Sequence, residues 1–196
     1  QTTPDPGLVP FFIRLASHST LSVRTGALTW LGSSKEGAVL PVLAAAAKDP
    51  DARIRATALQ ALGETEQEQA GATLTLYLRD SDEAIQAAAI GAVARLKRPE
   101  MIPYLIDRWK EDPVDTNRRA ALQGILDIRH PQVVTLLSAE YPSANRPQRQ
   151  MIVAGMQSWG EESLPFWVSG LRDPYGELRM GSVTALINFF HQSPHL

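Results

Sequence analysis

Four histidines are the residues whose side chains could most readily move a proton or bind a metal: His18, His130, His191 and His195. His18 and His130 lie in expected turns, and neither has a second histidine three or four residues away on a helix, as a helical zinc site needs. His191 and His195 are four residues apart, but Pro194 interrupts a helix between them. We therefore predict exposed histidines, no metal ligand, no cofactor-binding residue and no cofactor.

Other catalytic motifs are also missing from the sequence. The chain has no cysteine, which excludes a thiolate nucleophile, a disulfide framework and a cysteine-based zinc site. It contains no glycine-rich phosphate loop, no Gly-x-Ser-x-Gly nucleophile elbow and no His-Glu-x-x-His helix. We predict no catalytic residue, and a protein that is not an enzyme.

The composition is that of an ordinary folded domain. The 196 residues are 44% hydrophobic and 20% charged, which argues against disorder. The net charge of −2 lacks the basic excess of a protein that follows a phosphate backbone, so nucleic acid is not the favoured partner. No apolar run reaches the length of a transmembrane helix. The chain starts at Gln1 without a recognisable signal peptide, which leaves a cytoplasmic or an exported, for example periplasmic, location open.

A 31-residue period runs along the chain, and it indicates which elements must position any functional residue. One set of marks is the prolines that follow an apolar residue, at Pro10, Pro41, Pro103 and Pro165, one or two periods apart. A second set, which we call the reference positions, is Val23, Ile54, Ile85, Asn117, Gln148 and Leu178, spaced 30 to 32 residues apart. Apolar residues recur five and eight residues after each reference position, on the same face of a helix.

Each period predicts a hairpin of two helices. Helix A carries the proline in its first turn, where the missing N–H has no intrahelical partner. A turn containing Asp follows and caps helix B, which holds the reference position. Gly32 and Gly63 are expected to end helix B in the left-handed conformation. We predict one domain over 8–191 with units 8–37, 38–68, 69–98, 99–130, 131–161 and 162–191, an N-terminal tail 1–7 and a C-terminal tail 192–196.

The amino-acid pattern of the repeat is best preserved in 43–63 and recurs in 171–179. It resembles the short HEAT-like repeats first noted in phycobilisome lyase subunits. It shares an apolar helix, an Asp-Pro-Asp turn, Ile-Arg, an Ala-rich helix and a closing Leu-Gly. The resemblance is weakest in unit five, where 144–147 replaces the Asp turn. It implies an all-α fold, a right-handed α-solenoid of about six two-helix repeats of bacterial HEAT-like type.

The resemblance also implies ion pairs between a turn Asp and the Arg that starts helix B. The arginines are Arg24, Arg55, Arg118, Arg149 and Arg179, with Gln86 as the exception. The turn residues are Asp49, Asp80, Asp112 and Asp173, with His18 and Pro142 as exceptions. We interpret these pairs as structural, although a row of arginines could also hold an acidic partner.

In HEAT-like solenoids the B helices line the concave face, so their exposed residues form the candidate partner-binding stripe. Its members are Thr29, Trp30, Gln60, Glu64, Arg95, Gln123, Asp127, Ser158, Thr184 and Asn188. The stripe is either a plain solvated face or a groove for a protein partner. Trp30 stands where the other units have Ala or Gly, and it is either a filler of the array's end or an anchor for a partner.

Glycines inside the B helices, at Gly26, Gly91, Gly124, Gly155 and Gly181, each cost about 1 kcal/mol of helix stability relative to alanine. We expect close approach of adjacent B helices to compensate for them.

Both ends of the array are more apolar than a free-standing cap requires, with Phe11 and Phe12 at one end and Ile187, Phe189 and Phe190 at the other. This predicts that the natural protein continues on at least one side, or that an end docks on a partner or a second copy.

The favoured function is therefore a non-enzymatic protein–protein interaction scaffold whose partner the sequence does not identify. Two alternatives stay open. The lyase resemblance implies an accessory subunit of a bilin lyase or of a chaperone-like complex, and HEAT-like DNA glycosylases imply nucleic-acid binding. HEAT-repeat hydroxylases bind iron through His-Glu dipeptides, and this chain has none.

Overall fold

The computed structural model describes residues 5–192, and over that range the chain is helical without any strand. Residues 1–4 and 193–196, which include His195, lie outside the described residues. The α-helices are α1 Val9–Leu15, α2 Leu21–Gly32, α3 Val39–Ala46, α4 Ala52–Glu64, α5 Ala70–Thr75, α6 Glu83–Arg95, α7 Ile102–Glu111, α8 Asp115–Asp127, α9 Pro131–Glu140, α10 Arg146–Gln157, α11 Leu164–Gly170 and α12 Gly176–Gln192. Short 3₁₀ helices at Pro6–Leu8, Pro99–Met101, Tyr141–Ser143 and Gly160–Ser163 adjoin α1, α7, α9 and α11.

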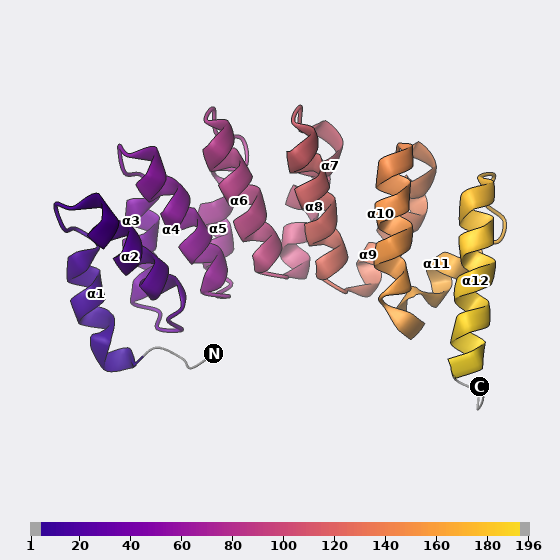
Figure 1. The fold of residues 1–196 in the computed structure, drawn as a ribbon, viewed down its shortest axis with the longest axis horizontal. Coiled ribbons are helices and arrows are strands. Elements are labelled where there is room, and N and C mark those ends of the chain that lie inside the picture. The colour runs from indigo at the N-terminus through magenta and orange to yellow at the C-terminus, as the bar shows by residue number, and fades with distance from the viewer. Residues whose placement is uncertain (1–4, 193–196) are drawn as a thin grey trace. The chain divides into compact units, whose positions relative to one another are not determined.

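Odd-numbered helices are the predicted A helices and even-numbered helices the B helices, so the chain is a succession of hairpins (Figure 1). This confirms the all-α repeat fold of the α-solenoid class. The chain divides into two compact units, residues 1–124 and 125–196. In the first unit, α2 packs against α4, and α4 packs against α6. In the second unit, α11 packs against α9 and α12. No helix in residues 5–192 has the length and apolar character needed to cross a membrane.

The starts of the helices follow the local sequence. The predicted prolines lie in the first turn of α1, α3, α7 and α11, and α9 starts at a further proline, Pro131. Every B helix starts three residues after the turn position, and four of these positions hold an Asp whose Oδ1 accepts the N–H two residues later: Asp49, Asp80, Asp112 and Asp173. His18 does the same in the first hairpin, because its Nδ1 accepts the N–H of Thr20 at 3.0 Å.

The fifth hairpin has a different turn. Its turn position, three residues before α10, is Ser143 and not Pro142 as the sequence suggested. The missing Asp is replaced by a capping box, in which the Asn145 side chain accepts the Gln148 N–H while the Gln148 side chain accepts the Asn145 N–H.

The predicted apolar ladder forms much of the core, except in the last hairpin, where Val183 is exposed and Leu186 is only half-buried. The reference residues Ile54, Ile85 and Leu178 are buried, and so is the polar Asn117. The residues eight positions further on are also buried: Leu31, Leu62, Val93, Ile125 and Met156. Complete burial of each such side chain contributes about 1.5–3 kcal/mol. The helical period therefore identified the side chains that hold the hairpins together.

The ends of the B helices differ from the prediction. Gly32 and Gly63 lie inside α2 and α4, and neither has a positive φ. Within the described residues, the left-handed positions are Glu66, Lys97, Arg129 and Gly160, at φ of 55°, 49°, 48° and 62°. They recur 31 or 32 residues apart, so the turn is a property of the repeat. Three of the four carry a side chain there, at a cost of order 1–3 kcal/mol each.

Candidate interaction surface

The B helices of residues 1–124 touch each other closely at one repeated position. We call the residue nine positions after the reference position the ninth position, and the residue seven positions after it the seventh position. The ninth position of one B helix contacts the seventh position of the next B helix. A Cβ placed on Gly32 would lie 2.7 Å from the Ala61 Cα, and one on Gly63 would lie 2.7 Å from the Ala92 Cα. These glycines are therefore contact residues, which explains why they are helical and not left-handed.

Further along the chain the same contact holds with the sizes exchanged. The ninth position is Ala94, and the facing seventh position is Gly124, where an added Cβ would lie 2.5 Å from the Ala94 Cβ. Within residues 125–196, Leu126 faces Gly155, where an added Cβ would lie 2.6 Å from a Leu126 Cδ. Each of these contacts thus pairs a glycine with a larger residue. The sequence shows this pairing of a glycine with a larger residue only when the ninth position of one repeat is compared with the seventh position of the next.

The expectation that every glycine inside a B helix marks a close approach is correct for Gly124 and Gly155 only. A Cβ on Gly26 or Gly91 would meet no described atom within 4 Å, and one on Gly181 would make an ordinary contact at 3.7 Å. The helix penalty at Gly26 and Gly91 has no compensating contact among the described residues.

The predicted stripe residues of the first unit lie along the stacked B helices. Thr29, Gln60, Glu64, Arg95 and Gln123 are exposed. Glu64 on α4 and Arg95 on α6 approach to 3.8 Å, with side chains 42% and 53% exposed. The stacking therefore brings opposite charges from neighbouring repeats together at the surface.

Trp30 differs from the other stripe residues because it is half-buried. Its ring stacks on Phe12 of α1, with centroids 3.9 Å apart and planes 12° apart. Among residues 5–192 no B helix precedes α2, and Phe12 of α1 covers this seventh position instead. In the second unit the predicted residues Asp127, Ser158, Thr184 and Asn188 are exposed.

The arginines at the start of the B helices have structural contacts. Arg24 forms an ion pair with Asp49 of the next hairpin, as predicted. Arg55 donates to the carbonyls of Asp49 and Pro50 at 3.0 and 3.1 Å, and it reaches the Asp82 carboxylate at 3.5 Å. Arg118 and Arg179 bind the equivalent two carbonyls of their own turns. Arg55 thus binds turn carbonyls within its own hairpin and a carboxylate of the next, whereas the carboxylate that Arg118 binds is Asp115 of its own hairpin.

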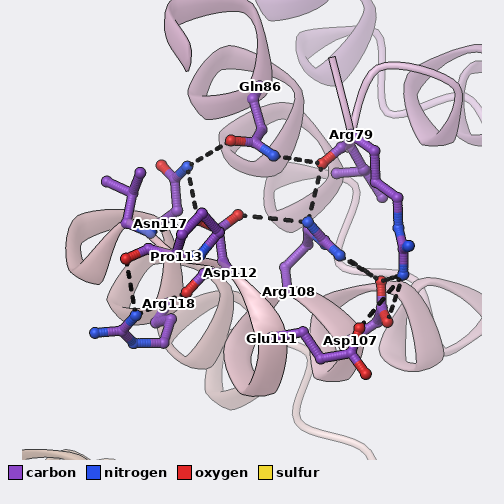
Figure 2. A network of polar contacts seen from close by, with 11 residues as sticks. Arg79, Gln86, Asp107, Arg108, Glu111, Asp112, Pro113, Asn117 and Arg118 are labelled. Carbon is purple, nitrogen blue, oxygen red and sulfur yellow. Dashed lines mark hydrogen bonds and ion pairs between the residues drawn. The ribbon is translucent and has the colours of Figure 1, made fainter. Parts of the chain in front are cut away.

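Gln86, the exception to the arginine pattern, belongs to a buried polar network (Figure 2). Its amide donates to the Leu78 carbonyl at 3.1 Å and accepts from Asn117 at 3.2 Å. Arg108 of α7 reaches the same Leu78 carbonyl and lies 3.6 Å from the Asp112 carboxylate. The guanidinium that helix B lacks here is supplied by helix A of the next hairpin, and Arg108 is only 5% exposed.

The outer edge of this network reaches solvent. Asp107 accepts hydrogen bonds from Arg79 at 2.9 Å and from Arg108 at 2.8 Å (Figure 2). The Arg79 hydrogen bond is the main reason that the pKa of Asp107 lies below its usual value. The hydrogen bonds and ion pairs of this network link residues of α6, α7 and α8, so the network joins neighbouring hairpins. Its arginines are already bound to carboxylates within the network.

Arg149 differs from the other arginines of the series in the contacts of its guanidinium group. Its Nε and Nη1 atoms are buried and have no hydrogen-bond partner among the described residues. The guanidinium lies 3.9 Å from the centre of the Tyr175 ring, whose hydroxyl donates to the Pro142 carbonyl. Loss of the Asp turn in the fifth hairpin has therefore left this side chain with a cation–π contact in place of hydrogen bonds.

This difference predicts opposite outcomes for one substitution. Arg55→Leu should cost about 1–3 kcal/mol of unfolding free energy, because two turn carbonyls lose their donor. Arg149→Leu should stay within about 0.5 kcal/mol of the parent, since it removes unsatisfied N–H groups together with a weak cation–π contact. Urea denaturation of both variants measures the difference. Equal losses at both positions would contradict the assignment.

The described residues contain no group of three or more His, Asp and Glu side chains that could hold a metal ion. The three histidines among them have backbone contacts. The Nδ1 atoms of His18 and His130 accept N–H groups at the starts of α2 and α9, and His191 Nδ1 lies 2.9 Å from the Ile187 carbonyl.

Comparison with known proteins agrees with this architecture. A designed armadillo repeat protein is 15% identical over 92% of this chain and 99% of its own, with a TM-score of 0.54. An engineered protein from a structural genomics consortium is 14% identical over 93% and 96%, with a TM-score of 0.54. The complex of CpcE and CpcF of phycocyanin lyase from Nostoc sp. PCC7120 gives 19% identity over 98% and 90%, with a TM-score of 0.49.

The two likenesses with a TM-score of 0.54, at such low identity, show the fold alone. No curated protein matches the sequence. A family model of HEAT repeats matches residues 2–63 and 40–126, which together cover more than half of the chain. The chain therefore belongs to the HEAT-repeat family.

Proposed function

We propose that this chain is a non-enzymatic scaffold that binds a protein partner on the exposed face of its B helices. In residues 1–124 the binding row consists of Thr29, Trp30, Gln60, Glu64, Arg95 and Gln123. Asp127, Ser158, Thr184 and Asn188 form its counterpart in residues 125–196. The observation that supports the row best is the exposed Glu64–Arg95 pair on two tightly stacked helices.

The Glu64–Arg95 pair is suited to a partner because the fold depends little on it. At 3.8 Å and about half exposed, such a pair contributes only about 0–1 kcal/mol to stability. A partner that presents its own charges can therefore take over both side chains at little cost. By contrast, Arg24, Arg55 and Arg118 are held by turn groups.

The close stacking favours binding in a second way. The contacts at Gly32 and Gly63 leave no room for the helices to slide or approach further. A rigid surface loses little conformational entropy when it binds, so more of the contact energy appears as affinity. Short polar side chains such as Thr29 and Gln60 suit the polar rim of an interface.

The test is affinity capture from the native extract, with quantification of each captured protein, using the wild type and the Glu64→Lys, Arg95→Glu double variant. We expect at least a tenfold loss of one specific protein. The matched control is Arg53→Glu with Glu83→Lys, which reverses two exposed charges at the starts of the same helices, outside the row. Equal capture by all three proteins would show that the row is not the binding surface.

A further inference from the structure

The junction between α10 and α12 lacks the glycine found at the other close contacts of B helices. Each described contact between a ninth and a seventh position includes a glycine, as at Gly155, where an added Cβ would lie 2.6 Å from a Leu126 Cδ. The equivalent residues of α10 and α12 are Gln157 and Ala185, and neither is a glycine. A crevice of about 270 Å³ is found beside α10, and Gln157 lines it. We call it the α10 crevice.

The α10 crevice is bordered by residues of the second unit only. Its α10 side combines the apolar Val153 and Ala154 with the polar Arg149 and Gln157, and the first turn of α12 contributes Glu177. Ala154 is exposed and lies four residues before Ser158 of the proposed binding row. Residues four apart share one face of a helix, so the crevice borders the face of α10 that carries the row.

Arg149 lacks the carboxylate that the equivalent arginine of the second hairpin reaches. Arg55 approaches Asp82, the residue directly before α6, at 3.5 Å. The residue directly before α12 is Tyr175, which offers Arg149 the face of its ring at 3.9 Å. The Arg149 Nε and Nη1 atoms are buried without an acceptor among the described residues. An anion in the crevice would therefore give this guanidinium the partner that the fold does not supply.

We propose that the α10 crevice binds the carboxylate of one Asp or Glu side chain of the protein partner, an inference that rests on the proposed scaffold function. The carboxylate pairs with Arg149, the Gln157 amide donates to it, and the methylene groups of the partner residue pack on Val153 and Ala154. The volume lies below the range of about 300–1,000 Å³ that small-molecule sites occupy, so a single side chain fits better than a cofactor.

The charges around the crevice favour a carboxylate over a phosphate group. Among the lining residues Arg149 is the cation and Glu177 the anion. The Glu177 side chain is 55% exposed and pairs with Arg146 at 3.3 Å. Burial raises the pKa of Tyr141, which also lines the crevice, so this side chain stays neutral. One guanidinium balances one carboxylate, whereas the second charge of a phosphate would be repelled by Glu177.

The first test is nuclear magnetic resonance titration with three small probes. The carboxylate of N-acetyl-glutamic acid amide is in the side chain, N-acetyl-glutamine amide has the same shape without charge, and the carboxylate of N-acetyl-alanine ends the chain. The glutamic acid probe should shift the Val153 and Ala154 amide signals saturably, with a Kd on the order of 1–10 mM. No saturable shift, or an equal response to either of the other probes, would overturn the proposal.

The second test removes the cation. Arg149→Leu should weaken binding of the glutamic acid probe by at least about tenfold. Its matched control is Arg172→Leu, which removes an exposed arginine of the same unit outside the crevice and should bind as the wild type does. Since Arg149→Leu is expected to keep the stability of the parent, a loss of binding reports the site and not the fold. Binding by Arg149→Leu equal to that of the wild type would overturn the proposal.

The third test supplies the missing carboxylate from within the chain. Tyr175→Asp places an acid where Asp82 meets Arg55 in the earlier hairpins, so it should pair with Arg149 and compete with the probe. Tyr175→Asn removes the same ring without adding a charge. We expect the Asp variant to bind the glutamic acid probe about tenfold more weakly than the Asn variant. Equal affinities of the two variants would overturn the assignment of Arg149 as the carboxylate-binding residue.

These outcomes are separate from the capture test of the binding row. That test changes α4 and α6 and measures a captured protein, whereas the probes report a crevice within residues 125–196. Either proposal can therefore fail while the other holds.

Discussion

Gly124→Leu is expected to unfold residues 1–124, or at least to lower their unfolding free energy by about 3 kcal/mol. An added Cβ on Gly124 would already lie 2.5 Å from the Ala94 Cβ and 3.2 Å from the Ala94 Cα. The rest of a leucine side chain would have to enter the same space, because Leu105 closes it at 3.3 Å on another side. Circular dichroism during thermal and urea unfolding measures the loss of helicity and of stability.

The matched control is Gly91→Leu, another glycine in the middle of a B helix. A Cβ at Gly91 would meet no described atom within 4 Å, so leucine adds only its better helix propensity there. We expect stability to be unchanged or to rise by up to about 1 kcal/mol. If Gly124→Leu and Gly91→Leu behaved alike, helix propensity and not contact between hairpins would govern both positions.

The second large effect is expected at the buried pair of Arg108 and Asp112. Arg108→Met removes the cation that lies 3.6 Å from the Asp112 carboxylate, whose side chain has no exposed surface. An uncompensated buried charge costs about 3–5 kcal/mol. The same variant takes one donor from the Leu78 carbonyl, which keeps its bond from Gln86. Urea unfolding should therefore show one of the lowest midpoints among single variants of the chain.

Adding Asp112→Asn to Arg108→Met should restore at least half of the loss. An asparagine Oδ1 can still accept from the Val114 N–H and the Asn117 amide, and it carries no charge to bury. Arg79→Ala serves as the control, because Arg79 binds the outer side of the same network but is largely exposed, and we expect little change. A single variant Arg108→Met as stable as Arg79→Ala would contradict the central role given to the buried pair.

The repeat, its hairpins and its apolar core could be predicted because each depends on residues close together in the chain. The proline in the first turn of α7 and the apolar residues after Ile54 determine helix position and buried face by local geometry alone. The structure confirms both. Glycine was harder to interpret, since it serves equally well as a left-handed helix end and as a contact residue. Gly32 was predicted to be a left-handed helix end, and it is instead a residue of the contact between two B helices.

What the sequence did not reveal lies between hairpins. Gly63 contacts Ala92 of the next repeat. Arg108 likewise reaches into the preceding repeat, where it takes the place of the arginine that Gln86 replaces. Which residues meet across two hairpins depends on the relative shift of the neighbouring helices. The sequence of one hairpin does not determine that shift. The exposure of the binding row followed from helical phase, whereas the stacking of Trp30 on Phe12 depends on how α1 meets α2.

The contact between ninth and seventh positions fixes the register of neighbouring B helices, and this register aligns the proposed binding row. Exchanging the pair Ala94 and Gly124 tests it most directly, since Ala94→Gly with Gly124→Ala reproduces the glycine–alanine order found at Gly63 and Ala92. The measurement is the unfolding free energy of both single variants and the double variant. We predict that Gly124→Ala alone is destabilised by about 1–3 kcal/mol, and that the double variant returns to within about 0.5 kcal/mol of the wild type. Losses that simply add in the double variant would contradict the claim.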